Sequence, residues 1–411
     1  MSNANNKYKI AIIAPTPFYY QVPLFKKLVG SPQIDLMVYY CSDETIRGAE
    51  VEKTYHTKSR FVDPENLLEG YKYKFLKNYS PHPSFLYWPM GLINFGICKE
   101  VKNGNYDAVI IPSWANLTWW LALFTCLMFN TPVFLTTDTN ISTDHFNSKL
   151  KMLLKRIMLG GLFFKNISIF LASGKANEDF YKSYGVPDKK MVRLPHWWGY
   201  EQFLEEAKKI KPERENLRKN FGIKKDDFVL LFAGRLDYHK NIFILLDAFK
   251  KVDYKNKKLF IVGDGPLRLQ VESYIKDCKI HEVYLKGFKK REALMQFYNI
   301  SDAFALPSKK EAWGMVVAEA MCFGLPIIVS DQVGARADLV KNGYNGFIFP
   351  FSDDEKLAGC IKKIIDMTPK ERLIFESRSF EIISKWINSV DPVEQILKIM
   401  ELLKFKNGNK K

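Results

Sequence analysis

Residues 228–263 read FVLLFAGRLDYHKNIFILLDAFKKVDYKNKKLFIVG. The stretch opens with the apolar run Phe228–Ala233, continues with apolar residues at helical spacing over Phe243–Lys251, and closes with a second apolar run before Gly263. A strand, a helix and a strand in this order predict two parallel strands joined by a right-handed crossover. The stretch therefore indicates an α/β protein.

Similar short runs, rich in apolar and β-branched residues, recur on both sides of this unit. They read KIAIIAP, IDLMVYY, AVIIP, VFLTT and ISIFLAS before it, and VYLKGF, AFALP, PIIVS and GFIFP after it. Most are separated by segments of helical period, such as Val22–Leu28. We therefore expect parallel sheets covered by helices on both faces, which is the doubly wound α/β architecture.

A charged segment without a strand pattern, Tyr200–Lys224, separates two such series. At about 150 residues per domain, 411 residues favour two or three domains. We predict a Rossmann-like domain over residues 1–200, a second over 201–385, and a C-terminal helix over 386–411 that crosses back to the first domain. Ligands of such paired domains bind in the cleft that the domains face.

Composition narrows the class of protein. Hydrophobic residues make up 47% and charged residues 26%, which excludes a disordered chain or a coiled coil. The net charge of +16 favours an anionic partner, either a nucleic acid, a phosphorylated small molecule or an acidic membrane surface. The sequence carries no helix-turn-helix, RNP-like or zinc-finger pattern, so we expect no specific nucleic-acid binding.

Two further features concern location. The six cysteines are scattered without metal-ligand spacing, and the first residues lack a signal-peptide pattern, so we expect a cytoplasmic protein. The long uncharged stretch after Asp107 is interrupted by Pro112, Asn116 and Pro132. We interpret it as a strand, a helix and a strand of a buried core; the alternative is a membrane-spanning helix.

Chemistry-bearing residues gather in the second half. Glu311 and Glu319 stand eight apart, and a helix beginning near Gly314 or Met315 would place its N–H groups beside Glu311, which makes an anion site. Upstream, Arg235 and Lys240 flank a short loop after a strand, a layout that suits a diphosphate. The alternative reading is a helix cap, a surface glutamate and two surface loop cations.

The order FAGRLDYHKN, IVGDGP, VYLKGF, ISDAFALPSKKEAWGMVVAEAMCFGLPIIVSD and NGFIF resembles the C-terminal half of retaining nucleotide-sugar glycosyltransferases of family 4, over about residues 228–350. The resemblance implies the GT-B fold, with an acceptor-binding first domain and a donor-binding second domain. It also implies that a sugar passes from a nucleotide diphosphate sugar, of unknown base, to an acceptor hydroxyl with retained configuration. Neither a metal ion nor another cofactor is implied.

The resemblance assigns roles residue by residue. Arg235 and Lys240 would neutralise the departing diphosphate, and Glu311 would hold hydroxyls of the donor sugar. Glu319 would bind the ribose. The other expected donor-binding residues are Gly234, Gly287, Phe288, Lys289, Ala312, Trp313, Gly314 and Met315, through which the base, the sugar and the distal phosphate would be held.

The first half resembles the family more loosely, through Ala172–Phe203. Its first strand-to-helix turn lacks the glycines that many members have, which leaves Tyr19 and Gln21 as acceptor-side candidates. Asp138 and His145 are the nearest candidates for a histidine that many relatives place near the donor sugar. For His145, a surface loop position is the alternative.

The segment Asn147–Asn166 mixes basic and apolar residues. It predicts either an amphipathic helix on an anionic membrane or a core-packed helix with solvated lysines. We expect a glycan or lipid-linked acceptor in polysaccharide, lipopolysaccharide or glycolipid assembly, with peripheral contact at the inner face of the plasma membrane. A sugar-nucleotide epimerase and a non-catalytic sugar-nucleotide-binding scaffold remain alternatives.

Overall fold

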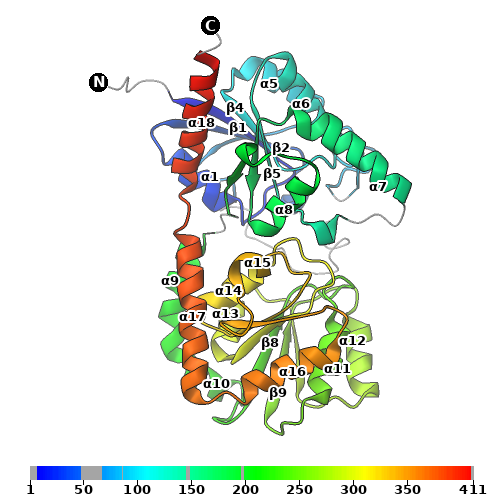
Figure 1. Ribbon diagram of the computed structural model, residues 1–411, viewed down its shortest axis with the longest axis vertical. Coiled ribbons are helices and arrows are strands. Elements are labelled where there is room, and N and C mark those ends of the chain that lie inside the picture. Colours follow the sequence, from blue (N-terminus) through cyan, green and yellow to red (C-terminus); the bar gives the residue numbers. More distant parts are fainter. Residues whose placement is uncertain (1–6, 48–66, 86, 145–148, 196–198, 409–411) are drawn as a thin grey trace. The chain divides into compact units, whose positions relative to one another are not determined.

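The computed structural model describes residues 7–47, 67–85, 87–144, 149–195 and 199–408 (Figure 1). The chain divides into two compact units. The first contains the described residues up to Gly199 together with those from Val390 onward, and the second contains Tyr200–Ser389. The second unit ends at Ser389 rather than at residue 385, because the helix α17 (Pro369–Ile387) runs past that point.

The first unit is built on a seven-stranded parallel sheet with the strand order β3-β2-β1-β4-β5-β6-β7. Its strands are β1 (Tyr8–Ala14), β2 (Ile34–Tyr40), β3 (Lys72–Phe75), β4 (Ala108–Ile111), β5 (Val133–Thr137), β6 (Ile169–Ala172) and β7 (Met191–Arg193). Its α-helices are α1 (Val22–Val29), α2 (Glu44–Arg47), α5 (Gly96–Gly104), α6 (Leu117–Met128), α7 (Lys149–Arg156), α8 (Lys175–Ser183) and α18 (Pro392–Gly408). Shorter or wider helical turns are η1 (Ile141–Thr143), η2 (Ile157–Phe163), η3 (Phe164–Asn166) and η4 (Asp188–Lys190).

Alternate residues of β1 supply the cores on the two faces of this sheet. Ile10 and Ile12 pack in one buried cluster and Ala11 and Ile13 in the other, as the period of two in a strand requires. The first cluster also contains residues of α1 and α18, which lie side by side (Figure 1). The buried side chains of α18 in that cluster are Ile396, Ile399 and Met400. The last helix is therefore part of the core of the first unit.

The second unit contains a six-stranded parallel sheet with the order β10-β9-β8-β11-β12-β13. Its strands are β8 (Phe228–Ala233), β9 (Lys257–Val262), β10 (Val283–Gly287), β11 (Ala303–Leu306), β12 (Ile327–Ser330) and β13 (Gly346–Phe349). Its helices are α9 (Tyr200–Ile210), η5 (Lys211–Glu213), α10 (Arg214–Asn220), α11 (Ile242–Lys251), α12 (Arg268–Asp277), α13 (Arg291–Ile300), α14 (Met315–Cys322), α15 (Arg336–Leu339), α16 (Asp354–Ile365) and α17. Both units have the doubly wound order, so the expected fold class is confirmed.

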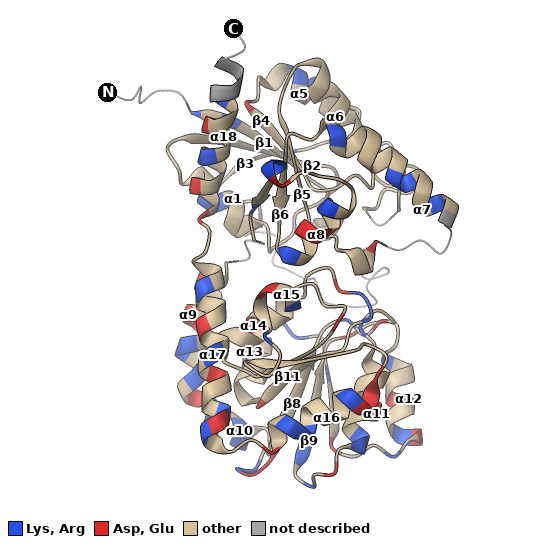
Figure 2. Ribbon diagram, in the orientation of Figure 1, with Lys and Arg blue, Asp and Glu red and all other residues tan. Residues whose placement is uncertain are grey.

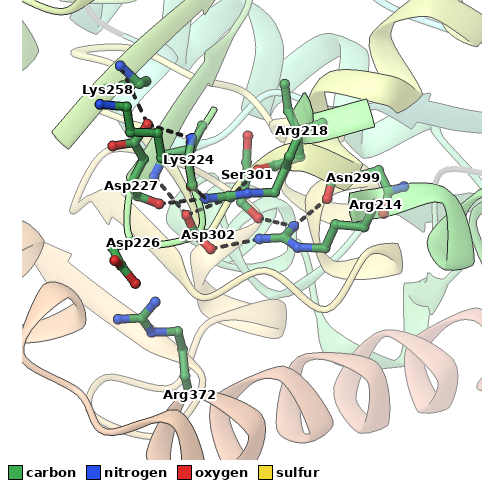
Figure 3. A network of polar contacts seen from close by, with 12 residues as sticks. Arg214, Arg218, Lys224, Asp226, Asp227, Lys258, Asn299, Ser301, Asp302 and Arg372 are labelled. Atoms are coloured by element: carbon green, nitrogen blue, oxygen red, sulfur yellow. Dashed lines mark hydrogen bonds and ion pairs between the residues drawn. The ribbon is translucent and has the colours of Figure 1, made fainter. Parts of the chain in front are cut away.

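A polar network holds α10 and the end of α13 to the amino ends of β8 and β11 (Figure 3). Asp302 accepts hydrogen bonds from Arg214 (2.7 Å), Arg218 (3.1 Å) and the backbone N–H of Val229 (2.8 Å). The two guanidinium groups also donate to the last carbonyls of α13, Arg214 to that of Asn299 and Arg218 to that of Ile300 at 2.8 Å. They thereby satisfy acceptors that a helix terminus leaves without an internal partner.

The long uncharged stretch divides into β4, α6 and β5, as its prolines and asparagines predict. Across the described parts of the chain, the structure contains no helix with the length and apolar character needed to cross a membrane.

Candidate functional site

The strand order of the second sheet reverses between β8 and β11, whose loops then leave the carboxyl edge in opposite directions. These loops are residues 234–241, which lead into α11, and residues 307–314, which lead into α14. In doubly wound folds such a switch point is where ligands bind. Most of the residues expected at the catalytic and donor sites lie in these two loops.

An ion pair joins the two loops. The Lys240 ammonium contacts Oε2 of Glu311, and Ser308 Oγ lies 3.3 Å from the same oxygen. The Lys240 and Glu311 side chains retain only 20% and 14% of their accessible surface. Two residues 71 positions apart therefore meet in a partly desolvated place, where charge interacts more strongly than in water.

The loop after β8 is shaped by two residues that the sequence analysis did not single out. Asp237 Oδ1 accepts from the backbone N–H groups of His239 (2.9 Å) and Lys240 (3.2 Å), which closes a tight turn. Asn241 has a left-handed backbone (φ 57°) and donates through Nδ2 to the carbonyls of Pro307 (3.2 Å) and Phe351 (2.8 Å). These contacts direct Lys240 towards the loop after β11.

Arg235 lies in the same loop and precedes the turn that Asp237 closes. Its Nε lies 3.8 Å from Oδ2 of Asp237, and its side chain is about one third exposed. Arg235 and Lys240 are therefore both arranged around Asp237.

The glycines of IVGDGP have a packing role. A Cβ on Gly263 would lie 1.8 Å from the carbonyl oxygen of Gly234, and one on Gly265 would lie 2.5 Å from that of Leu236. The loops after β8 and β9 are also joined by hydrogen bonds, such as Leu236 N–H to the Asp264 carbonyl at 2.9 Å. These glycines thus allow one loop to support the other.

Helix α14 begins at Met315, as expected, and Gly314 precedes it with a left-handed backbone (φ 98°). The preceding turn is held by a hydrogen bond of 3.1 Å from the Gly334 N–H to the Glu311 carbonyl. A helix N-terminus presents N–H groups that have no acceptor within the helix, and it favours negative charge. The start of α14 thus adds N–H donors beside Lys240 and Arg235, whose charges are balanced by Glu311 and Asp237.

The structure limits what Trp313 contributes. Its side chain is buried and stacks on Trp386 with ring centroids 5.3 Å apart, and its carbonyl accepts from Ala335 N–H at 2.7 Å. The indole is therefore part of the core, and only the backbone of Trp313 remains a candidate for ligand contact.

Glu319 lies in the interior of the second unit, 4% exposed, where Tyr298 donates a hydrogen bond of 2.6 Å to its Oε2. Burial raises the pKa of Glu319 from 4.5 to about 7, against the lowering effects of Tyr298 and the Arg291 charge. The expected ribose contact would use a carboxylate whose other oxygen is already held by Tyr298.

Gly287 ends β10 with a left-handed backbone (φ 67°), and its carbonyl accepts from Gly263 N–H at 2.9 Å. A Cβ there would lie 3.2 Å from Arg268 Nη1. Phe288 and Lys289 follow it and are half-buried. These base-binding candidates thus lie beside the loop after β9, which in turn supports the loop after β8.

The acceptor-side candidates belong to the first unit. Tyr19 is exposed in the loop after β1, Gln21 directly precedes α1, and Asp138 is exposed directly after β5. The strand β4 separates β1 from β5, so these residues follow strands that are not neighbours. His145 lies outside the described residues. Among the residues that are described, no three His, Cys, Asp or Glu side chains gather as metal ligands.

Sequence reasoning missed four residues that shape the site, namely Asp237, Asn241, Tyr298 and Ser308. The spacing of Asp237 three residues before Lys240 is a readable turn signal. Tyr298 precedes Glu319 by 21 positions on another helix, so no local pattern could have connected the two.

Comparisons with known proteins find similarity to glycosyltransferases. The family model described as glycosyl transferases group 1 matches residues 213–379. An uncharacterised glycosyltransferase of Methanocaldococcus jannaschii is 27% identical over 249 residues, 58% of this chain and 62% of that protein. The alpha-monoglucosyldiacylglycerol synthase of Acholeplasma laidlawii is 31% identical over 197 residues, 43% of this chain and 49% of that protein. The chain thus spans less than two thirds of the length of either relative.

Among solved structures, HepE of Anabaena in complex with UDP is similar with a TM-score of 0.72 and 18% identity, over 96% of this chain and 99% of that one. This likeness shows the fold. Residues 213–379 thus match the model of the glycosyl transferases of group 1, and the chain has the GT-B fold.

Proposed function

We propose that this chain is a retaining, metal-independent glycosyltransferase that moves a sugar from a nucleotide diphosphate sugar to an acceptor hydroxyl. The observation that carries the proposal is the Lys240–Glu311 ion pair at the switch point of the second sheet, beside Arg235 and the start of α14. The residues that resemblance names for leaving-group and sugar binding come from distant parts of the sequence and meet there.

In this reaction the bond between the anomeric carbon and the diphosphate oxygen breaks, and the electron pair leaves with the diphosphate. Lys240 and Arg235 would stabilise that charge, and the N–H groups at the start of α14 would add to their effect. The acceptor oxygen forms the new bond to the anomeric carbon, and its proton passes to the departing diphosphate oxygen. Glu311, held by Lys240 and Ser308, would accept hydrogen bonds from donor-sugar hydroxyls and fix the orientation of the sugar.

The names of similar proteins support the proposed donor and acceptor. The solved HepE structure contains UDP, and the Acholeplasma protein is named as a synthase of a glycolipid. We therefore propose a nucleotide sugar as donor and a glycan or lipid-linked hydroxyl as acceptor, in polysaccharide, lipopolysaccharide or glycolipid assembly. Tyr19, Gln21 and Asp138 are the proposed acceptor-side residues.

The proposed location is the cytoplasm. Each of the six cysteines is a free thiol, which supports a cytoplasmic location.

The test begins with a thermal-shift screen of the full chain against uridine, guanosine and adenosine diphosphates and their sugars. A ligand at 100 times its dissociation constant stabilises a protein by about 2.7 kcal/mol, which such a screen detects. Nucleotide release is then measured with glycan and lipid acceptors, with and without EDTA, and NMR gives the anomeric configuration of the product. Loss of transfer in EDTA, or an inverted product, would contradict the corresponding part of the proposal.

The same assays separate the alternatives. An epimerase would convert the donor sugar without an acceptor, and a binding scaffold would stabilise with nucleotide yet turn nothing over. Transfer requires that nucleoside diphosphate release rises with acceptor concentration and that the sugar is recovered on the acceptor.

A further inference from the structure

The helical segment formed by α7, η2 and η3 exposes an unusual amount of apolar surface. Leu150 and Ile157 are 65% and 61% exposed, and Leu153, Leu154 and Met158 are exposed as well. Burying such side chains in an apolar medium is favourable, because it removes apolar surface from water. Monomeric soluble proteins rarely present so many large apolar residues in one place, and such patches mark interaction sites.

The spacing of these residues shows that the segment has two apolar faces. Leu150, Leu153, Leu154 and Ile157 follow the i, i+3, i+4, i+7 rule and therefore share one face of the helix. The core-facing side is a different one: Leu159, four residues before the buried Phe163, is itself buried. The inner face packs the helix against the core of the first unit. The outer apolar face takes no part in that packing.

Cations flank the outer face. Lys151 and Arg156 are exposed on α7, one residue to either side of members of the apolar row. Lys155 is not counted among these exposed cations, because its ammonium contacts Asp144 and lies 5.9 Å from the centroid of the Trp114 ring. Residues 149–166 contain five Lys and Arg and no Asp or Glu. In Figure 2 the described part of this helix shows basic segments and no acidic one.

Helix α6 extends the surface. Trp120 of α6 contacts Phe163 of η2, with ring centroids 4.6 Å apart, so the two helices lie side by side. One turn beyond Trp120, Phe124 is exposed, and Met128 at the end of α6 is 77% exposed. The apolar surface thus spans two adjacent helices of the first unit.

We propose that this surface, formed by the outer side chains of α6 and α7, docks the protein on an anionic lipid bilayer. Leucine, isoleucine and methionine would enter the boundary between headgroups and acyl chains, while Lys151 and Arg156 meet lipid phosphates. The charge of the segment favours an anionic bilayer as the partner. Its charged residues are all Lys or Arg, and the whole chain has a net charge of +16. Docking through this surface does not depend on the proposed transfer reaction.

The test is co-sedimentation of the full chain with vesicles of phosphatidylcholine alone and of phosphatidylcholine mixed with phosphatidylglycerol. Wild type should bind the mixed vesicles and leave the neutral ones. The triple variant Leu150→Gln, Leu153→Gln, Ile157→Gln and the double variant Lys151→Glu, Arg156→Glu should each lower partitioning by about tenfold or more.

Two matched controls carry similar changes elsewhere. Leu269→Gln with Leu373→Gln alters exposed leucines of α12 and α17, and Lys219→Glu with Lys225→Glu makes the same charge change in the second unit. Both controls should bind vesicles like wild type. The melting temperature of every variant, measured without nucleotide, reports that each remains folded and keeps this test separate from that of the transferase.

Three outcomes would overturn the proposal. Wild type could fail to bind anionic vesicles, or the triple variant could bind them as well as wild type. Alternatively, light scattering could show a dimer that the triple variant abolishes while vesicle binding is absent, in which case the surface joins two copies of the chain.

Discussion

The Tyr298 hydroxyl lies 2.6 Å from Oε2 of Glu319 in the interior of the second unit, and links α13 to α14. Because the carboxyl group is buried, its pKa is raised to about 7. The proposed ribose ligand is therefore a group whose protonation changes near neutral pH, and this has a measurable consequence for stability.

Glu319 should make the protein less stable as pH rises. The folded protein holds a proton on this carboxyl up to about pH 7, whereas the unfolded chain releases it near 4.5, so stability present below pH 4.5 is lost as pH rises through 7. The contribution is up to about 3 kcal/mol, at 1.36 kcal/mol per unit. Glu319→Gln should remove it, and urea unfolding of both proteins between pH 4.5 and 8 measures the difference. Parallel pH curves would show that Glu319 has an ordinary pKa.

Lys240→Ala should lower kcat/KM about 100-fold, because one electrostatic contact to a departing charge is worth about 3 kcal/mol. Glu311→Gln should cause a similar loss, and the double variant should lose less than the sum, since the two side chains form one unit. The control is Lys251→Ala, which removes an exposed ion pair to Asp354 at the far end of α11. Equal activity of Lys240→Ala and Lys251→Ala would remove Lys240 from the mechanism.

Gly263→Ala should damage the site without touching any ligand-binding side chain. Its Cβ would meet the Gly234 carbonyl at 1.8 Å, so the loop after β8 must move and carry Lys240 with it. We expect a loss of about 1–3 kcal/mol of stability together with a rise in the dissociation constant for nucleotide. Gly359→Ala, in open space on α16, is the control and should be neutral or slightly stabilising. Unchanged nucleotide affinity in Gly263→Ala would mean that the loop tolerates displacement.

Arg218→Ala should destabilise the second unit by about 3 kcal/mol or more, because it leaves Asp302 partly uncompensated in a buried place. Its effect on nucleotide affinity should be small, since the network lies at the amino ends of the strands (Figure 3). Denaturant unfolding and a nucleotide titration measure the two effects. Lys208→Ala, which breaks an exposed pair with Glu205, should change stability by no more than about 0.5 kcal/mol. A small loss in Arg218→Ala would show that water replaces the guanidinium.

The sequence by itself determined the elements and the class of fold. Apolar runs of strand length, alternating with helical periods, specify parallel sheets because only crossovers can connect such strands. The same local logic placed the start of α14 after Gly314 and divided the uncharged stretch into β4, α6 and β5. The motifs around Lys240 and Glu311 were also readable, since each lies in one continuous stretch.

Only the tertiary structure decided which of these residues meet. Lys240 and Glu311 come together because β8 and β11 are neighbours at the switch point, a pairing that no local pattern encodes. Tyr298 reaches Glu319 across two helices, and Lys155 turns to Asp144 while Lys151 stays on the exposed face. Sequence periodicity shows that a helix has an apolar face, but packing decides which apolar face the core covers and which faces outward.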